Sequence, residues 1–249
     1  MKELFEHYET FAQMYSISTE IGRKRVDQLA KLLGDYLNLP EKALVLDVGC
    51  AGGVSTLAAI KSGFRAVGMD FRFDAIDEGK KNFEKENLPA FFVCADARKM
   101  PFKESAFDAA IFIFNPLPHW SMEDFLAICR QTEAVLKEGG VCFIEFHDFL
   151  QTIFDGKWRE TLVETIPKDR VVISIQKSFN TNDGTSERFV VNIENSQVRA
   201  TTMHLWGAWM IKFVLEIAGF VEIEIISYSA GFPRKVIIAK KRFNSEGRQ

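Results

Sequence analysis

A glycine-rich turn lies near residue 50, directly after an apolar stretch that ends in an acidic side chain. Residues 44–55 have the sequence LVLDVGCAGGVS, in which Asp47 stands two positions before Gly49 and small residues continue to Gly53. A glycine has no Cβ, so the backbone can approach a bound molecule closely. A carboxylate beside such a turn repels a diphosphate and attracts a cation. The spacing therefore favours a positively charged ligand, and it departs from the G-x-G-x-x-G turn that binds dinucleotides.

Two more acids stand at comparable places farther along the chain. Asp70 directly follows the predicted strand 65–69, and Asp96 lies two positions beyond the predicted strand 90–94. In an open α/β sheet, ligands bind at the carboxyl ends of the parallel strands. We therefore expect Asp47, Asp70 and Asp96 to converge on one crevice.

The elements that must position these acids follow from the hydrophobic pattern. Between residues 43 and 146, short apolar runs alternate with stretches of helical periodicity. The predicted strands are 43–48, 65–69, 90–94, 107–114 and 141–146, and the predicted helices are 19–36, 54–62, 73–87 and 122–137. Ser121 is the expected cap of the last helix, and Gly139 and Gly140 are expected to mark its end. Strict alternation predicts an α/β, doubly wound, mostly parallel sheet with helices on both faces.

The alternation stops after residue 150. Three apolar runs at 171–179, 187–193 and 198–204 are separated by polar turns, which predicts an antiparallel β insertion. After a helix at 207–218, the chain ends in two strands, 221–228 and 234–241, whose short connection permits only antiparallel pairing. The predicted organisation is a helical lid or cap at 1–40, a core at 41–150, a substrate cap at 151–206 and a completion of the core at 207–249.

The pattern as a whole resembles the class I, Rossmann-like S-adenosylmethionine-dependent methyltransferases. The first motif of that family is an acidic residue followed by x-G-x-G-x-G, which Asp47, Gly49 and Gly53 match, with Ala51 in place of the middle glycine. The resemblance implies a seven-stranded sheet whose last strand is antiparallel. It also implies S-adenosyl-L-methionine as the cofactor, S-adenosyl-L-homocysteine as its product, and no metal.

The resemblance further implies roles for individual residues. Asp70 would accept hydrogen bonds from the ribose hydroxyls, and Phe71 would lie against the adenine ring. Asp96 would accept the adenine amino proton, while the Ala97 amide would address a ring nitrogen. The full set of expected cofactor-binding residues is Asp47, Gly49, Cys50, Ala51, Gly53, Asp70, Phe71, Asp96, Ala97, Asn115 and Tyr15. Tyr15 and Phe11 either form an aromatic lid over the cofactor or pack against the first helix.

Histidines are the candidates for removing a proton from the methyl acceptor, because imidazole titrates near neutral pH. His119 follows the fourth predicted strand and is the first candidate, and His147 after the fifth strand is the second. His204 is either a packed histidine or a residue that the insertion folds over the acceptor. Asn115 and Pro116 resemble the start of the N-P-P-aromatic motif of amino-group methyltransferases, although the next two residues depart from it.

Composition restricts the partners. The chain has 249 residues, a net charge of -3 and no dense basic stripe, which disfavours a nucleic-acid substrate. The four cysteines are widely separated and fit buried free thiols in a reducing compartment. No apolar run is long enough for a membrane span, and the N-terminus lacks a secretory signal, so a cytoplasmic location is predicted.

The predicted activity is therefore methyl transfer to a small-molecule acceptor, through oxygen or nitrogen, that the sequence does not identify. A homodimer is compatible with these residues, which do not set the oligomeric state. Two alternatives remain at this point. One is a catalytically silent S-adenosylmethionine-binding protein, suggested by the altered glycine turn. The other is an NAD-dependent oxidoreductase.

Overall fold

The computed structural model describes residues 15–166, 170–194, 196–229 and 233–243. The first 14 residues of the predicted N-terminal lid or cap, Phe11 among them, lie outside these residues. Helices and strands alternate through the first half of the chain as the hydrophobic pattern predicts. The elements of this half are α2 (Glu20–Tyr36), β1 (Leu44–Val48), α3 (Val54–Lys61), β2 (Arg65–Asp70), α4 (Phe73–Lys85), β3 (Ala90–Cys94), β4 (Phe107–Phe112), the short 3₁₀ helix η2 (Leu117–His119), α5 (Met122–Val135) and β5 (Leu136–His147).

The main sheet has seven strands in the order β10-β11-β5-β4-β1-β2-β3. Strands β1 to β5 pair in parallel, whereas β11 (Pro233–Lys241) is antiparallel to both of its neighbours, β5 and β10 (Phe220–Ser229). The predicted doubly wound sheet with an antiparallel last strand is confirmed. Parallel crossovers bring the ends of β1, β2 and β3 to one edge, where ligands bind in open α/β sheets.

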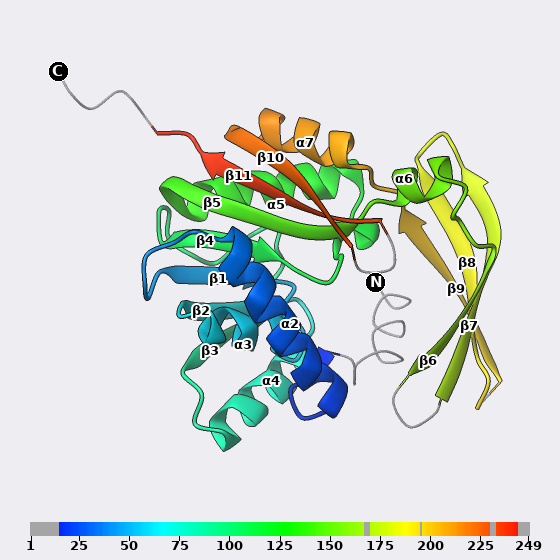
Figure 1. Cartoon of the computed structure of the whole chain (residues 1–249), viewed down its shortest axis with the longest axis horizontal. Coiled ribbons are helices and arrows are strands. Elements are labelled where there is room, and N and C mark those ends of the chain that lie inside the picture. The colour runs from blue at the N-terminus through cyan, green and yellow to red at the C-terminus, as the bar shows by residue number, and fades with distance from the viewer. Residues whose placement is uncertain (1–14, 167–169, 195, 230–232, 244–249) are drawn as a thin grey trace.

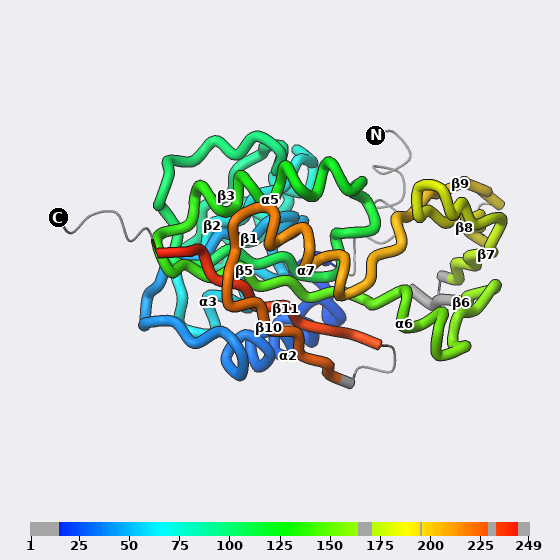
Figure 2. The backbone as a smooth tube through the Cα atoms, turned by 90° about the horizontal axis from the view of Figure 1, so that it is seen from above, coloured from blue at the N-terminus to red at the C-terminus, as the bar shows by residue number. Residues whose placement is uncertain are grey.

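Helices cover both faces of this sheet. Figure 2 shows the sheet between α5 and α7 (Ala208–Ile217) on one side and α2 and α3 on the other. Phe125 of α5 and Ile211 of α7 belong to one buried apolar cluster, and Leu33 of α2 and Phe83 of α4 belong to the other. Strands buried on both faces explain why their sequences are continuous apolar runs.

The junction between α5 and β5 differs from the sequence prediction. Ser121 caps α5 by accepting the Asp124 amide, as expected, but the helix ends at Val135 and Leu136 already belongs to β5. The prediction that the helix extends to residue 137 and ends at Gly139 and Gly140 is wrong. Leu136 is fully buried beside Phe107 of β4, and the register then shifts before Val141. Gly139 has a φ of +70° and lies against the Phe243 ring, so it serves an irregular strand instead of a helix end.

A second sheet has four antiparallel strands in the order β6-β7-β8-β9 and lies beside the core in Figure 1. Three of them, β7 (Arg170–Asn180), β8 (Thr185–Asn192) and β9 (Gln197–His204), confirm the predicted runs. The sequence analysis missed β6 (Thr161–Ile166) and α6 (Phe149–Phe154). Each has six residues, which is too short for a hydrophobic period to stand out. Among the described residues, no helix is long and apolar enough to cross a membrane.

Candidate active site

The glycine-rich turn joins β1 to α3 and is folded against the end of β2. The amides of Gly49 and Cys50 both donate to the Met69 carbonyl, at 2.8 and 3.0 Å. Gly49, Ala51 and Gly53 have φ values of +80°, +45° and +91°. Ala51 thus adopts a left-handed backbone at the position of the family's middle glycine, which costs about 1–2 kcal/mol for a residue with a Cβ.

Asp70 ties the end of β2 to this turn. Its two carboxylate oxygens accept the amides of Ala51 at 3.0 Å and Arg72 at 2.9 Å. The side chain is almost buried, at 8% exposure, and burial raises its pKa while the two amide bonds act in the opposite direction. The carboxylate is therefore fixed at the strand end, with its remaining lone pairs available to a ligand.

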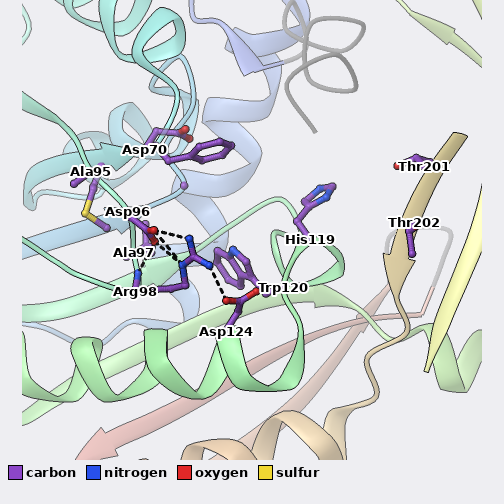
Figure 3. Close-up of a pocket in the computed structure, with 14 residues that line it drawn as sticks. Asp70, Ala95, Asp96, Ala97, Arg98, His119, Trp120, Asp124, Thr201 and Thr202 are labelled. Carbon is purple, nitrogen blue, oxygen red and sulfur yellow. Dashed lines mark hydrogen bonds and ion pairs between the residues drawn. The ribbon is translucent and has the colours of Figure 1, made fainter. Parts of the chain in front are cut away.

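Asp96, after β3, is held by an arginine that the sequence analysis did not single out. Both Asp96 oxygens accept bonds from the Arg98 guanidinium, at 2.7–3.1 Å, and Arg98 also donates to Asp124 at 2.9 Å. Figure 3 shows this chain of charges along one wall of the cavity. The hydrogen bonds from Arg98 lower the pKa of Asp96, which keeps the carboxylate ionised.

A cavity of about 310 Å³ opens at the ends of β1, β2 and β3, and a smaller one of about 70 Å³ adjoins it. Six predicted site residues line the larger cavity, namely Gly49, Asp70, Phe71, Asp96, Ala97 and His119. Two more, Tyr15 and Ala51, line the smaller one. The structure thus brings together two strand-end carboxylates, an aromatic ring and an open glycine turn, a set that fits the hydroxyls, base and cationic part of a charged nucleoside.

Asp47 has a different environment from the other two acids. It is fully buried beneath the turn, where Oδ2 accepts the hydroxyls of Ser55 and Thr56, both at 2.7 Å. Oδ1 has no hydrogen-bond partner among the described residues. Burial raises the pKa of Asp47 to about 7. The three acids therefore do not all meet in one crevice, since Asp47 lines neither cavity.

Three other predicted cofactor-binding residues also lie outside both cavities. The Cys50 side chain is buried. A Cβ at Gly53 would come within 2.6 Å of the Phe83 ring, so this glycine is needed for packing. Asn115 uses its side-chain oxygen to accept the His147 amide at 3.0 Å.

The two candidate histidines occupy unlike places. His119, at the end of η2, lines both cavities and lies opposite Thr201 and Thr202 of β9 in Figure 3. The His147 ring is stacked on Phe149 and bonded through Nε2 to Thr152 at 2.7 Å, away from both cavities. Burial, followed by the nearby Arg234 charge, lowers the pKa of His147 to about 4.

The wall across the cavity from Asp70 and Asp96 contains two threonines that sequence reasoning missed. Thr201 and Thr202 line the larger cavity, together with Trp120, which stacks on Phe125. Trp206, just after β9, donates from its indole nitrogen to the Leu117 carbonyl at 2.8 Å and so joins the inserted sheet to η2. No local sequence signal marks the contact of Trp206 with Leu117 or the place of the two threonines, because these join segments far apart in the chain.

Within the described residues, no group of three or more His, Cys, Asp or Glu side chains could hold a metal ion. The four cysteines are free, and all but Cys94 are buried. The polar groups that face the cavity are thus the carboxylates, His119, Arg98 and the two threonines.

Comparisons with known proteins agree with this geometry. Residues 45–140 match a methyltransferase domain family. A demethylmenaquinone methyltransferase of Corynebacterium efficiens is 30% identical over 141 residues, which are 56% of this chain and 57% of that protein. The chain thus spans little more than half of that relative's length. One of Staphylococcus aureus is 25% identical over 209 residues, 81% of this chain and 78% of that protein.

Solved structures show the same architecture. A crystal structure of a Pyrococcus horikoshii protein superposes with a TM-score of 0.75 at 19% identity and covers 95% of this chain and 99% of that one. At this identity the likeness shows the fold alone. The fold and the strand-end site define a Rossmann-like α/β protein. Within that fold, residues 45–140 are similar in sequence to a methyltransferase domain.

Proposed function

We propose that the protein transfers a methyl group from S-adenosyl-L-methionine to a small organic acceptor. One observation carries this proposal: Asp70 and Asp96, at neighbouring strand ends, line the same cavity as His119, Thr201 and Thr202. A nucleoside-binding wall and a wall with a proton acceptor thus face each other across one space. The match of residues 45–140 to methyltransferase domains supports this reaction over dinucleotide-dependent oxidoreduction.

The nucleoside side would be held by residues of the first half of the chain. Asp70 is fixed by two backbone amides and can accept the ribose hydroxyls, and Asp96 can accept the amino group of the base. Phe71 and the Ala97 amide lie on the same wall. When bound, S-adenosylmethionine supplies a methyl group activated by a positively charged sulfonium. Asp47 supports this side indirectly, because its carboxylate binds the first turn of α3 beneath the glycine turn.

The acceptor side would orient the acceptor and accept its proton. His119 is the side chain on this wall whose imidazole can take a proton from a hydroxyl or ammonium group of the acceptor. Thr201 and Thr202 offer hydroxyls for hydrogen bonds, and Trp120 offers a flat apolar surface. His147, bonded to Thr152 outside the cavities, is the weaker candidate for the base. Its ring packs on Phe149, so we assign it to the packing of α6 against β5.

A small acceptor is favoured over a polymer. The inserted sheet contributes β9 to the cavity wall, which closes the site on the side opposite the nucleoside wall. The relatives named demethylmenaquinone methyltransferase are consistent with an organic ring compound as the acceptor. Among the described residues that line the larger cavity, the lysine and arginine side chains are represented by Arg98 alone, which is engaged by Asp96 and Asp124, so this wall offers no basic track for a nucleic acid.

The proposal is tested by incubating the protein with methyl-labelled S-adenosylmethionine and a fractionated metabolite extract. We expect a labelled product of low mass, absent from reactions with an Asp70→Ala variant. Calorimetry with S-adenosylhomocysteine is run in parallel. Binding without turnover on any fraction would identify a catalytically silent cofactor-binding protein. Thermal stabilisation by NADH but not by S-adenosylhomocysteine would contradict the proposal.

A further inference from the structure

A buried carboxylate lies behind the site and has no part in the chemistry described so far. Glu145, on β5, is 1% exposed. Its Oε2 accepts the Phe114 amide at 3.0 Å, from the segment that follows β4. Its Oε1 accepts the Tyr228 hydroxyl at 2.6 Å and is paired with the Arg234 guanidinium. One side chain therefore joins the exit of β4 to the hairpin formed by β10 and β11.

The backbone that Glu145 holds is unusual. Phe114 and Asn115 have φ values of +66° and +61°, two consecutive left-handed residues of which neither is glycine. Such conformations persist only where surrounding contacts determine them. Two contacts from β5 do so here, namely Glu145 with the Phe114 amide and the His147 amide with the Asn115 side chain at 3.0 Å.

This segment shapes the cavity wall. Phe114 lines the smaller cavity, and its ring meets the edge of Tyr15 with 5.3 Å between centroids. Pro116 lines the same cavity, and its carbonyl accepts the His119 amide at 3.2 Å. The direction of the chain at Phe114 therefore sets where η2 begins and where His119 lies.

The other oxygen of Glu145 is fully engaged from the opposite side. Tyr228 and Arg234 are register partners in the β10–β11 hairpin, so both donors reach Oε1 from one rigid element. Burial, followed by the neighbouring Glu145 charge, raises the pKa of Tyr228, so its hydroxyl remains a donor. With Oε1 fixed in this way, Oε2 has a single orientation, toward the Phe114 amide.

We propose that Glu145 is a positioning residue that holds Phe114 and Asn115 in the left-handed conformation on which the cavity wall and the place of His119 depend. The inference rests on the proposed function, because it gives Glu145 a task in the same site. A role confined to stability would leave the ligand affinity of the folded protein unchanged.

The test is Glu145→Gln, which has the same shape. Arg234 and Tyr228 both donate, so the glutamine oxygen will face them and its NH₂ group will face the Phe114 amide, which leaves two donors opposed. Because Phe114 and Pro116 line the smaller cavity together with Asp70 and Phe71, we expect S-adenosylhomocysteine to bind about 10-fold more weakly by calorimetry. We also expect the Phe114 amide to exchange its hydrogen at least about 10-fold faster. Glu145→Asp keeps the charge opposite Arg234 but is one methylene shorter, and we expect the same two changes.

Lys235→Gln is the matched control. Lys235 lies on β11 opposite Phe146 of β5 and pairs at 2.8 Å with the buried Asp148, which directly follows β5, whereas the Phe114 amide is bonded to Glu145. We expect a lower melting temperature with unchanged affinity and unchanged exchange at Phe114. The inference is overturned if the Glu145 variants bind S-adenosylhomocysteine as tightly as the wild type, or if Phe114 exchanges at the wild-type rate. A wild-type protein that fails to bind S-adenosylhomocysteine would instead overturn the proposed function, and the exchange rates would still test the role of Glu145.

Discussion

The two sides of the cavity are held by different kinds of contact. On the nucleoside side, Asp70 binds amides within the β1–β2 region, and Asp96 binds an arginine two residues away. On the acceptor side, the wall depends on contacts between distant segments, such as Trp206 with Leu117. Locally determined contacts form wherever the strand and turn form, whereas the acceptor wall requires the whole chain to be folded.

The largest effect that would sharpen this comparison is expected at His119. If His119 removes the acceptor proton, His119→Asn should lower the rate of methyl transfer by about 100- to 10,000-fold. The affinity for S-adenosylhomocysteine should stay within about 3-fold of the wild type, since the change affects the acceptor wall. Initial rates with the acceptor found in the extract, together with calorimetry, measure both quantities. If S-adenosylhomocysteine affinity falls as much as the rate, His119 belongs to the nucleoside side, and the two walls do not have the separate roles described here.

A smaller effect is expected on the other side. Asp70→Ala should weaken S-adenosylhomocysteine binding by about 100-fold, because two hydrogen bonds to a charged group are lost. Asp77→Asn is the matched control, as Asp77 is on α4, pairs with Lys81 and lines neither cavity. Calorimetry of the two variants under the same buffer gives the ratio. If Asp70→Ala binds S-adenosylhomocysteine as tightly as the wild type, Asp70 does not bind the nucleoside and this part of the proposal is wrong.

The smallest effect concerns stability as a function of pH. The pKa of Asp47 is raised to about 7 in the folded protein from its ordinary value of 3.8. Between these values the folded protein binds a proton that the unfolded chain does not, so the contribution of Asp47 to stability is lost as the pH rises. Asp47→Asn cannot titrate, and its stability relative to the wild type should therefore increase from pH 4 toward pH 8.

Urea unfolding of both proteins at several pH values measures this difference. His147 contributes with the opposite sign, because its pKa is lowered to about 4 and its contribution is lost as the pH falls. It is present in both proteins, so it cancels in the difference. A constant difference between Asp47→Asn and wild type across this range would contradict the buried environment of Asp47.

Much of the core could be predicted from the sequence because its signals are local. The alternation of apolar runs with helical periodicity fixed the order of strands and helices, and the acids after the strands marked the edge where the cavity lies. Asp70 and Asp96 line that cavity. The direction of Asp47 was not foreseen, because a strand buried on both faces gives no indication of which way a side chain points. Ser55 and Thr56 in the first turn of the next helix were the available signal.

The acceptor wall could not be predicted for a physical reason. Thr201 and Thr202 reach the cavity only because the inserted sheet packs beside η2, and that contact joins residues more than 80 positions apart. His119 and His147 both follow strands in the sequence, yet one lies in the cavity and the other is bonded to Thr152.

The Asp96–Arg98–Asp124 chain has a consequence for how a purine would be received. Both oxygens of the Asp96 carboxylate accept hydrogen bonds from the Arg98 guanidinium, which restricts rotation of the carboxylate before a ligand binds. Ordering a free polar side chain on association costs about 0.5–1.5 kcal/mol. If Asp96 accepts the amino group of a base as proposed, part of that ordering has already occurred during folding, because Arg98 holds the carboxylate before the ligand binds.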